Sequence, residues 1–179
     1  MSDDPEAARP SRNRVYICLG SNINAEGNLP AAVRLLGEHG TVVAASTVYE
    51  TLPVVFTAQA DFLNAAVLLE TDRSLEDVFE RVVPCVESAL GRIRDPANPN
   101  GPRTIDLDVA LFNDVVTRTS RHELPDPDIT RRAFVAIPLA ELDPGYVHPV
   151  LRQTLATIAA RFTIAKGDMR PRSDVRLLP

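Results

Sequence analysis

The chain has 179 residues, of which 45% are hydrophobic and 24% charged, and its formal net charge is -5. This length allows one domain with a well-buried core, and a second domain is not expected. The negative charge argues against a general nucleic-acid binder, because such proteins place a basic surface against the phosphates.

The cysteines and the two ends of the chain bear on its compartment. Cys18 lies in an apolar segment and Cys85 in a helical pattern, which favours core thiols over a disulfide framework or a zinc site. The start lacks the apolar run of a signal peptide, and no segment approaches 18 apolar residues. We therefore expect a cytoplasmic protein without membrane contacts. We also expect a flexible tail over residues 1–13, a single domain over 14–165 and a mobile tail over 166–179.

The first half of the chain alternates strand and helix patterns. An apolar run ends at Gly20-Ser21-Asn22, which is typical of a strand followed by a tight turn. Asn28 is a candidate N-cap for the helix that follows. The predicted elements are a strand over 15–19, a helix over 29–36, strands over 41–51 and 62–70, and a long loop over 52–61.

The second half begins with a capping-box pattern at Ser74 and apolar residues at helical spacing, within which Pro84 predicts a kink. The predicted elements are a helix over 74–91, a loop over 92–102, a strand over 105–112, a short extended segment over 115–117, and helices over 134–142 and 151–162. The order strand, helix, strand, strand, helix, strand is that of the ferredoxin-like α+β architecture. We expect an antiparallel sheet covered by helices on one face, with strand and helix additions at the C-terminus.

Two acids alternate with apolar residues at the start of the strand over 105–112. Because strand side chains alternate between faces, Asp106 and Asp108 share one face, and Leu107 points to the other. Neighbouring carboxylates repel, by about 3 kcal/mol at an effective dielectric near 20, so a cation is needed if they are buried. Hard oxygen ligands of this kind suit Mg²⁺. The alternative is an edge strand with two solvated acids.

Arginines surround this strand in the sequence. Guanidinium groups and a divalent cation together neutralise the charge of a polyphosphate. The chain lacks the glycine-rich P-loop motif, so any ATP would have to be held by side chains and metal. Taken singly, each arginine is compatible with a plain surface position. The residues concerned are Arg92, Arg94, Arg103, Arg121 and Arg132.

Asn64 is unusual because it interrupts an otherwise apolar strand. A buried amide must find hydrogen-bond partners, which are either internal sheet contacts or the polar edge of a flat heterocycle. His39, His122 and His148 lie at no spacing that suggests zinc, and we interpret them as structural.

The segment Gly101-Pro102-Arg103-Thr104-Ile105-Asp106-Leu107-Asp108 resembles the signature of the 6-hydroxymethyl-7,8-dihydropterin pyrophosphokinases, which belong to the folate pathway. Other segments resemble this family in the same order, between residues 15 and 149. They are Leu19-Gly20-Ser21-Asn22, Tyr49-Glu50-Thr51, Asp61-Phe62-Leu63-Asn64-Ala65-Ala66, Gly91-Arg92-Ile93-Arg94, Arg132-Ala133-Phe134-Val135 and Pro138-Leu139.

The resemblance implies transfer of a pyrophosphoryl group from ATP to the hydroxymethyl group of the pterin, with release of AMP. Asp106 and Asp108 would hold two Mg²⁺ ions. The catalytic or phosphate-binding residues would be Arg92, Arg94, Arg103, Arg121 and Arg132, with Glu87 on the nucleotide side. The pterin slot would be formed by Thr51, Phe62, Asn64 and Phe134, with Phe134 stacking on the ring. The loops over 52–61 and 92–102 correspond to lids that exclude water from the reaction.

Three residues depart from the family pattern. Asp126 replaces a histidine that donates a hydrogen bond towards an ATP phosphate, and an ionised carboxylate either repels the phosphates or contacts metal. Asn100 replaces an aromatic lid residue, and Phe62 replaces a tyrosine. These departures are compatible with a pterin enzyme that is slower or closes differently, or with a relative that acts on another hydroxymethyl heterocycle. A non-catalytic nucleotide-binding paralogue is the third alternative.

Overall fold

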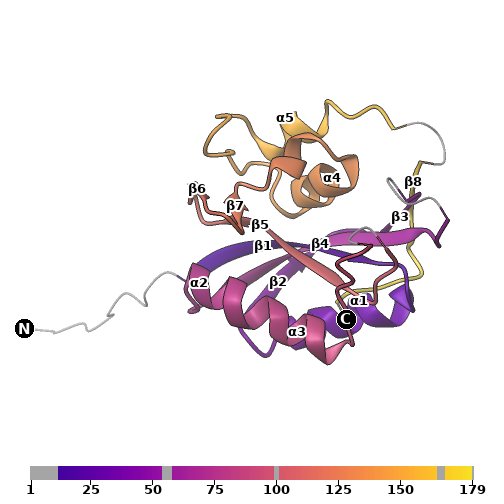
Figure 1. Ribbon diagram of the computed structural model, residues 1–179. Coiled ribbons are helices and arrows are strands. Elements are labelled where there is room, and N and C mark those ends of the chain that lie inside the picture. The colour runs from indigo at the N-terminus through magenta and orange to yellow at the C-terminus, as the bar shows by residue number, and fades with distance from the viewer. Residues whose placement is uncertain (1–11, 54–57, 99–100, 165–167, 179) are drawn as a thin grey trace, which may run out of the picture.

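The computed structural model describes residues 12–53, 58–98, 101–164 and 168–178 (Figure 1). Most of the predicted N-terminal tail lies outside these ranges, and Asn13 already belongs to the first strand. The main sheet has the order β5-β1-β4-β3-β8, with β2 also paired to β4, and every pairing is antiparallel. Its strands are β1 (Asn13–Ser21), β2 (Thr41–Ala45), β3 (Tyr49–Thr51), β4 (Phe62–Thr71), β5 (Asp106–Phe112) and β8 (Met169–Pro171).

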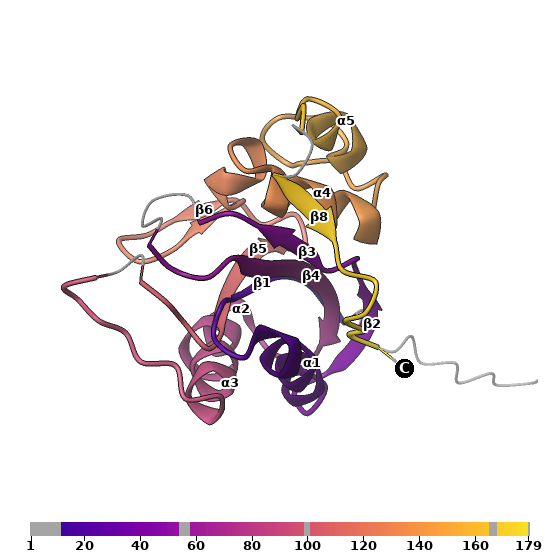
Figure 2. The ribbon, with the colours of Figure 1, turned by 90° about the vertical axis from the view of Figure 1, so that its right-hand side faces the viewer.

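Helices cover both faces of this sheet (Figures 1 and 2). One face packs against α1 (Ala25–Leu36), α2 (Leu75–Asp77) and α3 (Val83–Ala89). The other face packs against α4 (Ala133–Leu142) and α5 (Leu155–Ala159). The short strands β6 (Thr117–Arg118) and β7 (Glu123–Leu124) form a separate hairpin, and a 3-10 helix spans Pro127–Thr130.

The ferredoxin-like prediction is confirmed, because the order of elements from β1 to β5 gives the expected antiparallel sheet. The layer of α4 and α5 goes beyond the helices expected on a single face. Tyr16, Leu68 and Leu111 on the sheet are buried beneath Val135 and Leu139 of α4. This second layer forms one wall of the site described below.

Two local predictions in the first half were wrong in detail. The first helix begins at Ala25, not at Leu29, because Asn24 adopts the left-handed conformation that turns the chain into the helix. The Asn28 side chain instead donates to the carbonyl of Ile23 at 2.7 Å. The single strand predicted over 41–51 is divided into β2 and β3 at Ser46, whose hydroxyl accepts a hydrogen bond from the Ala66 N–H.

The helix predicted over 74–91 is continuous but irregular. Ser74 caps it as predicted, since its hydroxyl accepts from the Asp77 N–H at 3.2 Å. A π-helical turn, Val78–Val82, separates α2 from α3, and Pro84 follows it directly. Proline has no N–H for the carbonyl four residues earlier, so the chain widens by one residue there. The irregularity predicted at Pro84 therefore takes the form of a π-helical turn just before this residue.

The last two elements also differ from expectation. The final helix is confined to Leu155–Ala159 and begins where the Thr154 hydroxyl accepts from the Thr157 N–H at 3.1 Å. The segment expected to be a mobile tail contains β8, which pairs with β3. The domain boundaries and the mobility of this segment stay predictions. In the part of the chain that the structure describes, no helix is long and apolar enough to cross a membrane.

His148 is buried, and its Nδ1 accepts hydrogen bonds from the N–H groups of Val150 at 3.3 Å and Leu151 at 3.2 Å. Burial lowers the pKa of His148 below its usual 6.5, because removal from water disfavours the charged form of the ring.

We therefore predict that the contribution of His148 to the free energy of unfolding is fully present above pH 6.5. This contribution should be lost as the pH falls below that value. The unfolded chain binds the proton more readily than the folded one, which fixes this sign. Urea unfolding between pH 5 and 8, compared with His148→Gln, measures the effect. Identical pH slopes in the two proteins would contradict it.

Candidate active site

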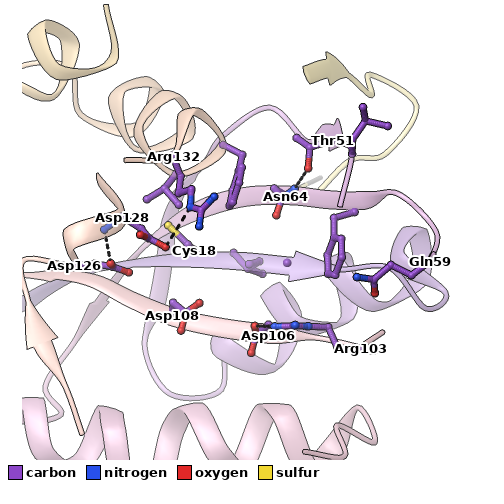
Figure 3. A pocket seen from close by; sticks show the side chains of 16 residues that line it. Cys18, Thr51, Gln59, Asn64, Arg103, Asp106, Asp108, Asp126, Asp128 and Arg132 are labelled. Atoms are coloured by element: carbon purple, nitrogen blue, oxygen red, sulfur yellow. Dashed lines mark hydrogen bonds and ion pairs between the residues drawn. The ribbon is translucent and has the colours of Figure 1, made fainter. Parts of the chain in front are cut away.

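Two neighbouring pockets meet at β5. The first has a volume of about 230 Å³ and lies between the sheet and α4, and the second, of about 390 Å³, lies towards α3 and the loop before the 3-10 helix. Asp108 and Asp126 line both pockets, so a ligand that spans the two pockets must pass these carboxylates. Figure 3 shows both residues in the first pocket. We refer to the first pocket as the slot pocket and to the second as the outer pocket.

The two acids of β5 share a face, as their alternation predicts. Leu107 and Val109 are buried in the core below the sheet, while Asp106 and Asp108 line the slot pocket on the other side. Pairing with β1 places Asp106 opposite Gly20, and Asp108 opposite Cys18. The rigid sheet therefore fixes the direction of both carboxylates.

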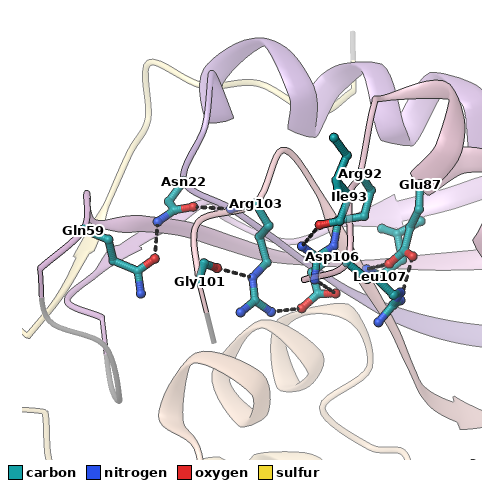
Figure 4. Close-up of polar contacts among 10 residues, drawn as sticks. Asn22, Gln59, Glu87, Arg92, Ile93, Gly101, Arg103, Asp106 and Leu107 are labelled. Carbon is teal, nitrogen blue, oxygen red and sulfur yellow. Dashed lines mark hydrogen bonds and ion pairs between the residues drawn. The ribbon is translucent and has the colours of Figure 1, made fainter. Parts of the chain in front are cut away.

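Asp106 is held by two arginines. Arg103 donates a hydrogen bond to one carboxylate oxygen, and an Arg92 nitrogen lies 3.5 Å from the other (Figure 4). The Arg92 side chain is only 8% exposed, and its Nε has no hydrogen-bond partner among the described residues. An unsatisfied buried donor is costly, so this guanidinium is suited to an additional acceptor such as a phosphate oxygen.

Asp108 lies where a negative charge is disfavoured. Its surroundings raise its pKa to about 7, first by desolvation and then by the negative charges of Asp106, Asp126 and Glu87, while Arg94 acts in the opposite direction. The Asp108 side chain is nevertheless exposed to solvent. Repulsion from the neighbouring carboxylates is the contribution to the raised pKa that a ligand can relieve. A bound cation would remove it.

Asp126 is held by backbone contacts just before the 3-10 helix. Its N–H donates to the Ala110 carbonyl at 2.9 Å, and its carboxylate accepts from the Asp128 N–H at 2.8 Å. Desolvation raises the pKa of Asp126, and the charges of Asp128 and Glu123 add to the effect. Asp128 itself lies 3.9 Å from the Arg132 Nε. The carboxylate at position 126 thus has a structural role as a cap, besides facing both pockets.

The end of the slot pocket beside Asn64 is partly aromatic. The Asn64 side-chain amide donates to the Thr51 hydroxyl at 2.8 Å, and both residues are buried. This contact leaves the Asn64 oxygen directed into the pocket (Figure 3). Phe62 and Phe134 line the same space, and the Arg103 guanidinium lies 5.5 Å from the centre of the Phe62 ring. Such a slot can hold a flat ring between apolar faces while an amide binds its edge.

The outer pocket combines a buried acid with basic groups. Glu87 is buried, accepts from the Leu107 N–H at 3.0 Å, and accepts from Arg94 at 2.7 Å (Figure 4). Arg121 also lines the pocket and lies 3.4 Å from Glu80. Glu87 therefore connects α3 to β5 and at the same time orients an arginine toward the pocket.

Asn22 connects the two loops that flank the slot pocket. Its oxygen accepts from the Arg103 N–H at 2.8 Å, and its amide donates to Gln59 at 3.0 Å and to the Ala60 carbonyl at 3.1 Å (Figure 4). The loops after β3 and before β5 are thereby held together. Residues 54–57 and 99–100, including the departure at Asn100, lie outside the described residues.

The structure brings the residues singled out by sequence into these adjoining spaces. Those that line the slot pocket are Thr51, Phe62, Asn64, Arg103, Asp106, Asp108, Asp126, Arg132 and Phe134. Those that line the outer pocket are Glu87, Arg94, Arg121 and again Asp108 and Asp126. Arg92 borders a third space beside Arg94 and reaches the site through Asp106.

Several residues of the site were not predicted. Cys18, interpreted as a core thiol, lines the slot pocket, where burial raises its pKa. Gln59 and Asp128 line it as well. His122, interpreted as structural, stacks on Phe79 with ring centres 3.8 Å apart and lines the outer pocket. The alternation of β1 could have placed Cys18 on the face of Asp108, but no local pattern marks the others.

The metal-binding capacity of the site rests on a pair of carboxylates. Among the residues that the structure describes, no group of three or more His, Cys, Asp or Glu side chains is arranged to hold a metal ion. Mg²⁺ commonly takes one or two protein carboxylates and completes its shell with water and substrate phosphates. Asp106 and Asp108 fit that requirement.

Comparison with known proteins adds an independent finding. A family model described as 7,8-dihydro-6-hydroxymethylpterin-pyrophosphokinase (HPPK) matches residues 16–144. The chain is 43% identical over 133 residues to the 2-amino-4-hydroxy-6-hydroxymethyldihydropteridine pyrophosphokinase of Bacillus subtilis, covering 73% of this chain and 78% of that protein. It is 38% identical over 150 residues to the protein of the same name from Methylorubrum extorquens, covering 81% and 93% of the two chains.

Solved structures share the fold at much lower identity. The HPPK-DHPS of Plasmodium falciparum with SDX-DHP aligns with a TM-score of 0.64 and 14% identity over 87% of this chain. Another HPPK-DHPS, in complex with substrates, gives a TM-score of 0.67 and 11% identity over 90% of this chain. The chain spans only 45% and 46% of these two solved chains, so the likeness concerns the fold of one part of each.

The repulsion around Asp108 leads to a prediction about stability. Without divalent cations, Asp108→Asn should raise the free energy of unfolding at pH 8 by about 1 kcal/mol, a figure reduced for solvent screening. Since the pKa is raised in the folded state, the advantage should grow as the pH rises from 4 to 7 and then stay level. Chemical unfolding with a chelator present measures it. An advantage that is the same at pH 4 and pH 8 would contradict the assigned cause.

Proposed function

Because the chain belongs to the 7,8-dihydro-6-hydroxymethylpterin-pyrophosphokinase family, we propose that it transfers pyrophosphate from ATP to the hydroxymethyl group of 6-hydroxymethyl-7,8-dihydropterin. The products are AMP and the pterin diphosphate, in a step of folate synthesis. The position of Asp108 on the boundary between the slot pocket and the outer pocket carries this proposal. A pyrophosphoryl group that passes from a nucleotide to an alcohol must cross such a boundary.

The slot pocket is the proposed site of the pterin. Its end with Thr51 and Asn64 offers a fixed amide oxygen, which can accept hydrogen bonds from the amino and ring N–H groups of the heterocycle. Phe62 and Phe134 supply aromatic faces for the ring. The hydroxymethyl group then points along the pocket towards Asp106 and Asp108.

The outer pocket is the proposed site of ATP. Glu87, Arg94 and Arg121 line it, and Arg132 borders the slot side of the same boundary. The chain has no P-loop motif, so these side chains would have to hold the nucleotide. Asp106 and Asp108 would bind Mg²⁺, in our proposal two ions. The metal would supply positive charge that offsets the negative charge of the triphosphate.

The arginines already have carboxylate partners, and this bears on how the phosphates would bind. Arg92 and Arg103 contact Asp106, and Arg94 contacts Glu87. On binding, these guanidinium groups would exchange carboxylate contacts for contacts with phosphate oxygens, on which negative charge accumulates during the transfer. Preorganised groups of this kind position the phosphoryl group in line with the hydroxymethyl oxygen.

Asp126 is the observation that favours a second candidate. A carboxylate facing both pockets adds negative charge where phosphates would lie. A relative that pyrophosphorylates another hydroxymethyl heterocycle would retain the same metal and arginine residues. A non-catalytic nucleotide-binding paralogue would bind ATP without releasing AMP.

The first test removes each acid of β5. We predict that Asp106→Ala and Asp108→Ala each lower AMP release in the presence of ATP, Mg²⁺ and 6-hydroxymethyl-7,8-dihydropterin by about a thousandfold. The fold should persist, because the apolar face of β5 is untouched. Asp114→Ala, which removes an exposed acid just beyond the strand, is the matched control. Turnover like that of the wild type in either variant would remove the metal assignment.

The second test concerns Asp126. If the pterin reaction is native, Asp126→His should tighten ATP binding or raise turnover by about tenfold, because a donor replaces a repelling charge. Asp126→Asn is the matched control, since its side-chain oxygen can still cap the 3-10 helix through the Asp128 N–H. Loss of activity in both variants would show that the carboxylate has its own role and would favour the other heterocycle.

A further inference from the structure

β3 is only three residues long, and strands lie on both of its edges. On one edge Thr51 pairs with Phe62 of β4, and on the other it pairs with Met169 of β8. The N–H of Arg172 extends the second pairing by donating to the Val48 carbonyl at 2.8 Å. We call residues 168–178 the C-terminal strap, because this segment closes the sheet beside Thr51 (Figure 2).

Side chains hold β3 from both faces of the sheet. On the α4 face, Glu141 accepts hydrogen bonds from the Tyr49 hydroxyl and from the Thr47 N–H. On the opposite face, Glu50 contacts the guanidinium groups of Arg170 and Arg172. The two faces follow from strand alternation, which puts Tyr49 and Thr51 on one side and Glu50 on the other.

Arg172 is a junction among three parts of the chain. Its guanidinium contacts Glu26 in the first turn of α1, lies 3.7 Å from Glu50, and lies 2.7 Å from Asp174 within the strap. The side chain is 22% exposed. It therefore joins the strap to the helix layer and to β3 at once, which a simple surface pair would not do.

The rest of the strap is anchored to the core. Val175, Leu177 and Leu178 pack against the apolar cluster beneath the sheet, on the face covered by α1 and α3. The strap is thus anchored to the core, and its ion pairs with Glu50 connect β3 to the same core. Thr51, at the end of β3, lies in the slot pocket with its hydroxyl bonded to Asn64.

We propose that the C-terminal strap is a positioning element for the heterocyclic substrate, and that Arg172 is its principal positioning residue. By holding Glu50, Arg172 keeps β3 in register and so keeps the Thr51 hydroxyl against the Asn64 amide. With the amide fixed, its oxygen stays directed into the slot pocket. This inference rests on the proposed function only for the identity of the heterocycle.

The effect should be confined to the slot pocket. The outer pocket is lined by residues of the π-helical turn, α3, the loop after α3, β5 and the segment from Arg121 to Pro127. Among the described residues, none that line it belongs to β3 or to the strap. Loosening β3 should therefore weaken the heterocycle without changing the nucleotide. A general loss of stability would affect both ligands.

The test uses the full chain with Arg172→Ala, Arg172→Lys and, as a matched control, Arg34→Ala, which breaks an exposed ion pair on α1. The dissociation constant of 6-hydroxymethylpterin is measured with Mg²⁺ and a non-hydrolysable ATP analogue present, and that of the analogue is measured alone. Hydrogen exchange over residues 47–52, followed by mass spectrometry, reports on β3 without any ligand.

We expect Arg172→Ala to weaken pterin binding by about three- to tenfold, to leave binding of the analogue unchanged, and to speed exchange over β3. Arg172→Lys should recover part of the affinity, since it keeps the charge and loses the planar fork. Glu50→Gln, which removes the charge gripped by both arginines and keeps the side-chain shape, should behave like Arg172→Ala and serves if the latter does not fold.

Unchanged pterin affinity in folded Arg172→Ala, or equal weakening of both ligands, would overturn the proposal. Failure of the proposed function looks different. In that case the wild-type chain would bind the analogue but no pterin, and the exchange of β3 in Arg172→Ala and Glu50→Gln would still decide whether the strap restrains Thr51.

Discussion

The site depends on mutual repulsion between carboxylates that the sheet does not allow to separate. Asp106 and Asp108 project from the same face of β5, and their backbone is fixed by pairing with β1. Arg92 and Arg103 neutralise the first acid, whereas the second keeps a raised pKa among other acids. A binding site with unbalanced negative charge has a built-in affinity for cations, and a polyphosphate brings such cations with it. In the proposed reaction, the arginines around the pair would then become available to the phosphate oxygens.

Sequence periodicity captured this arrangement because it depends on one strand. Alternation alone put Asp106 and Asp108 on one face and Leu107 on the other, and the Ser74 cap follows from a local pattern. The shape of the slot pocket is a different matter. The strand pattern marked Asn64 as an unusual amide, whereas the role of Thr51 came only from resemblance to a family. The structure adds that the two side chains are hydrogen-bonded to each other.

The features that sequence reasoning missed arise from contacts between distant segments. β8 has three residues and no periodicity, and it is a strand because β3 offers it an edge. α1 begins earlier than predicted because Asn24 adopts the left-handed conformation. That conformation belongs to the turn before the helix and leaves no mark in the helical pattern. Asn22 joins two loops that are far apart in the sequence, through contacts with Gln59, Ala60 and Arg103. No local pattern could have indicated these contacts.

The outer edge of β5 has a consequence for self-association. β5 is at the end of the main sheet, where an exposed strand could template pairing with another molecule. Its Leu107 N–H is occupied by the Glu87 carboxylate, and its Ala110 carbonyl by the Asp126 N–H. The side chain and loop that build the outer pocket thus also block intermolecular strand addition. The outer pocket and the protection of this edge therefore depend on the same few atoms.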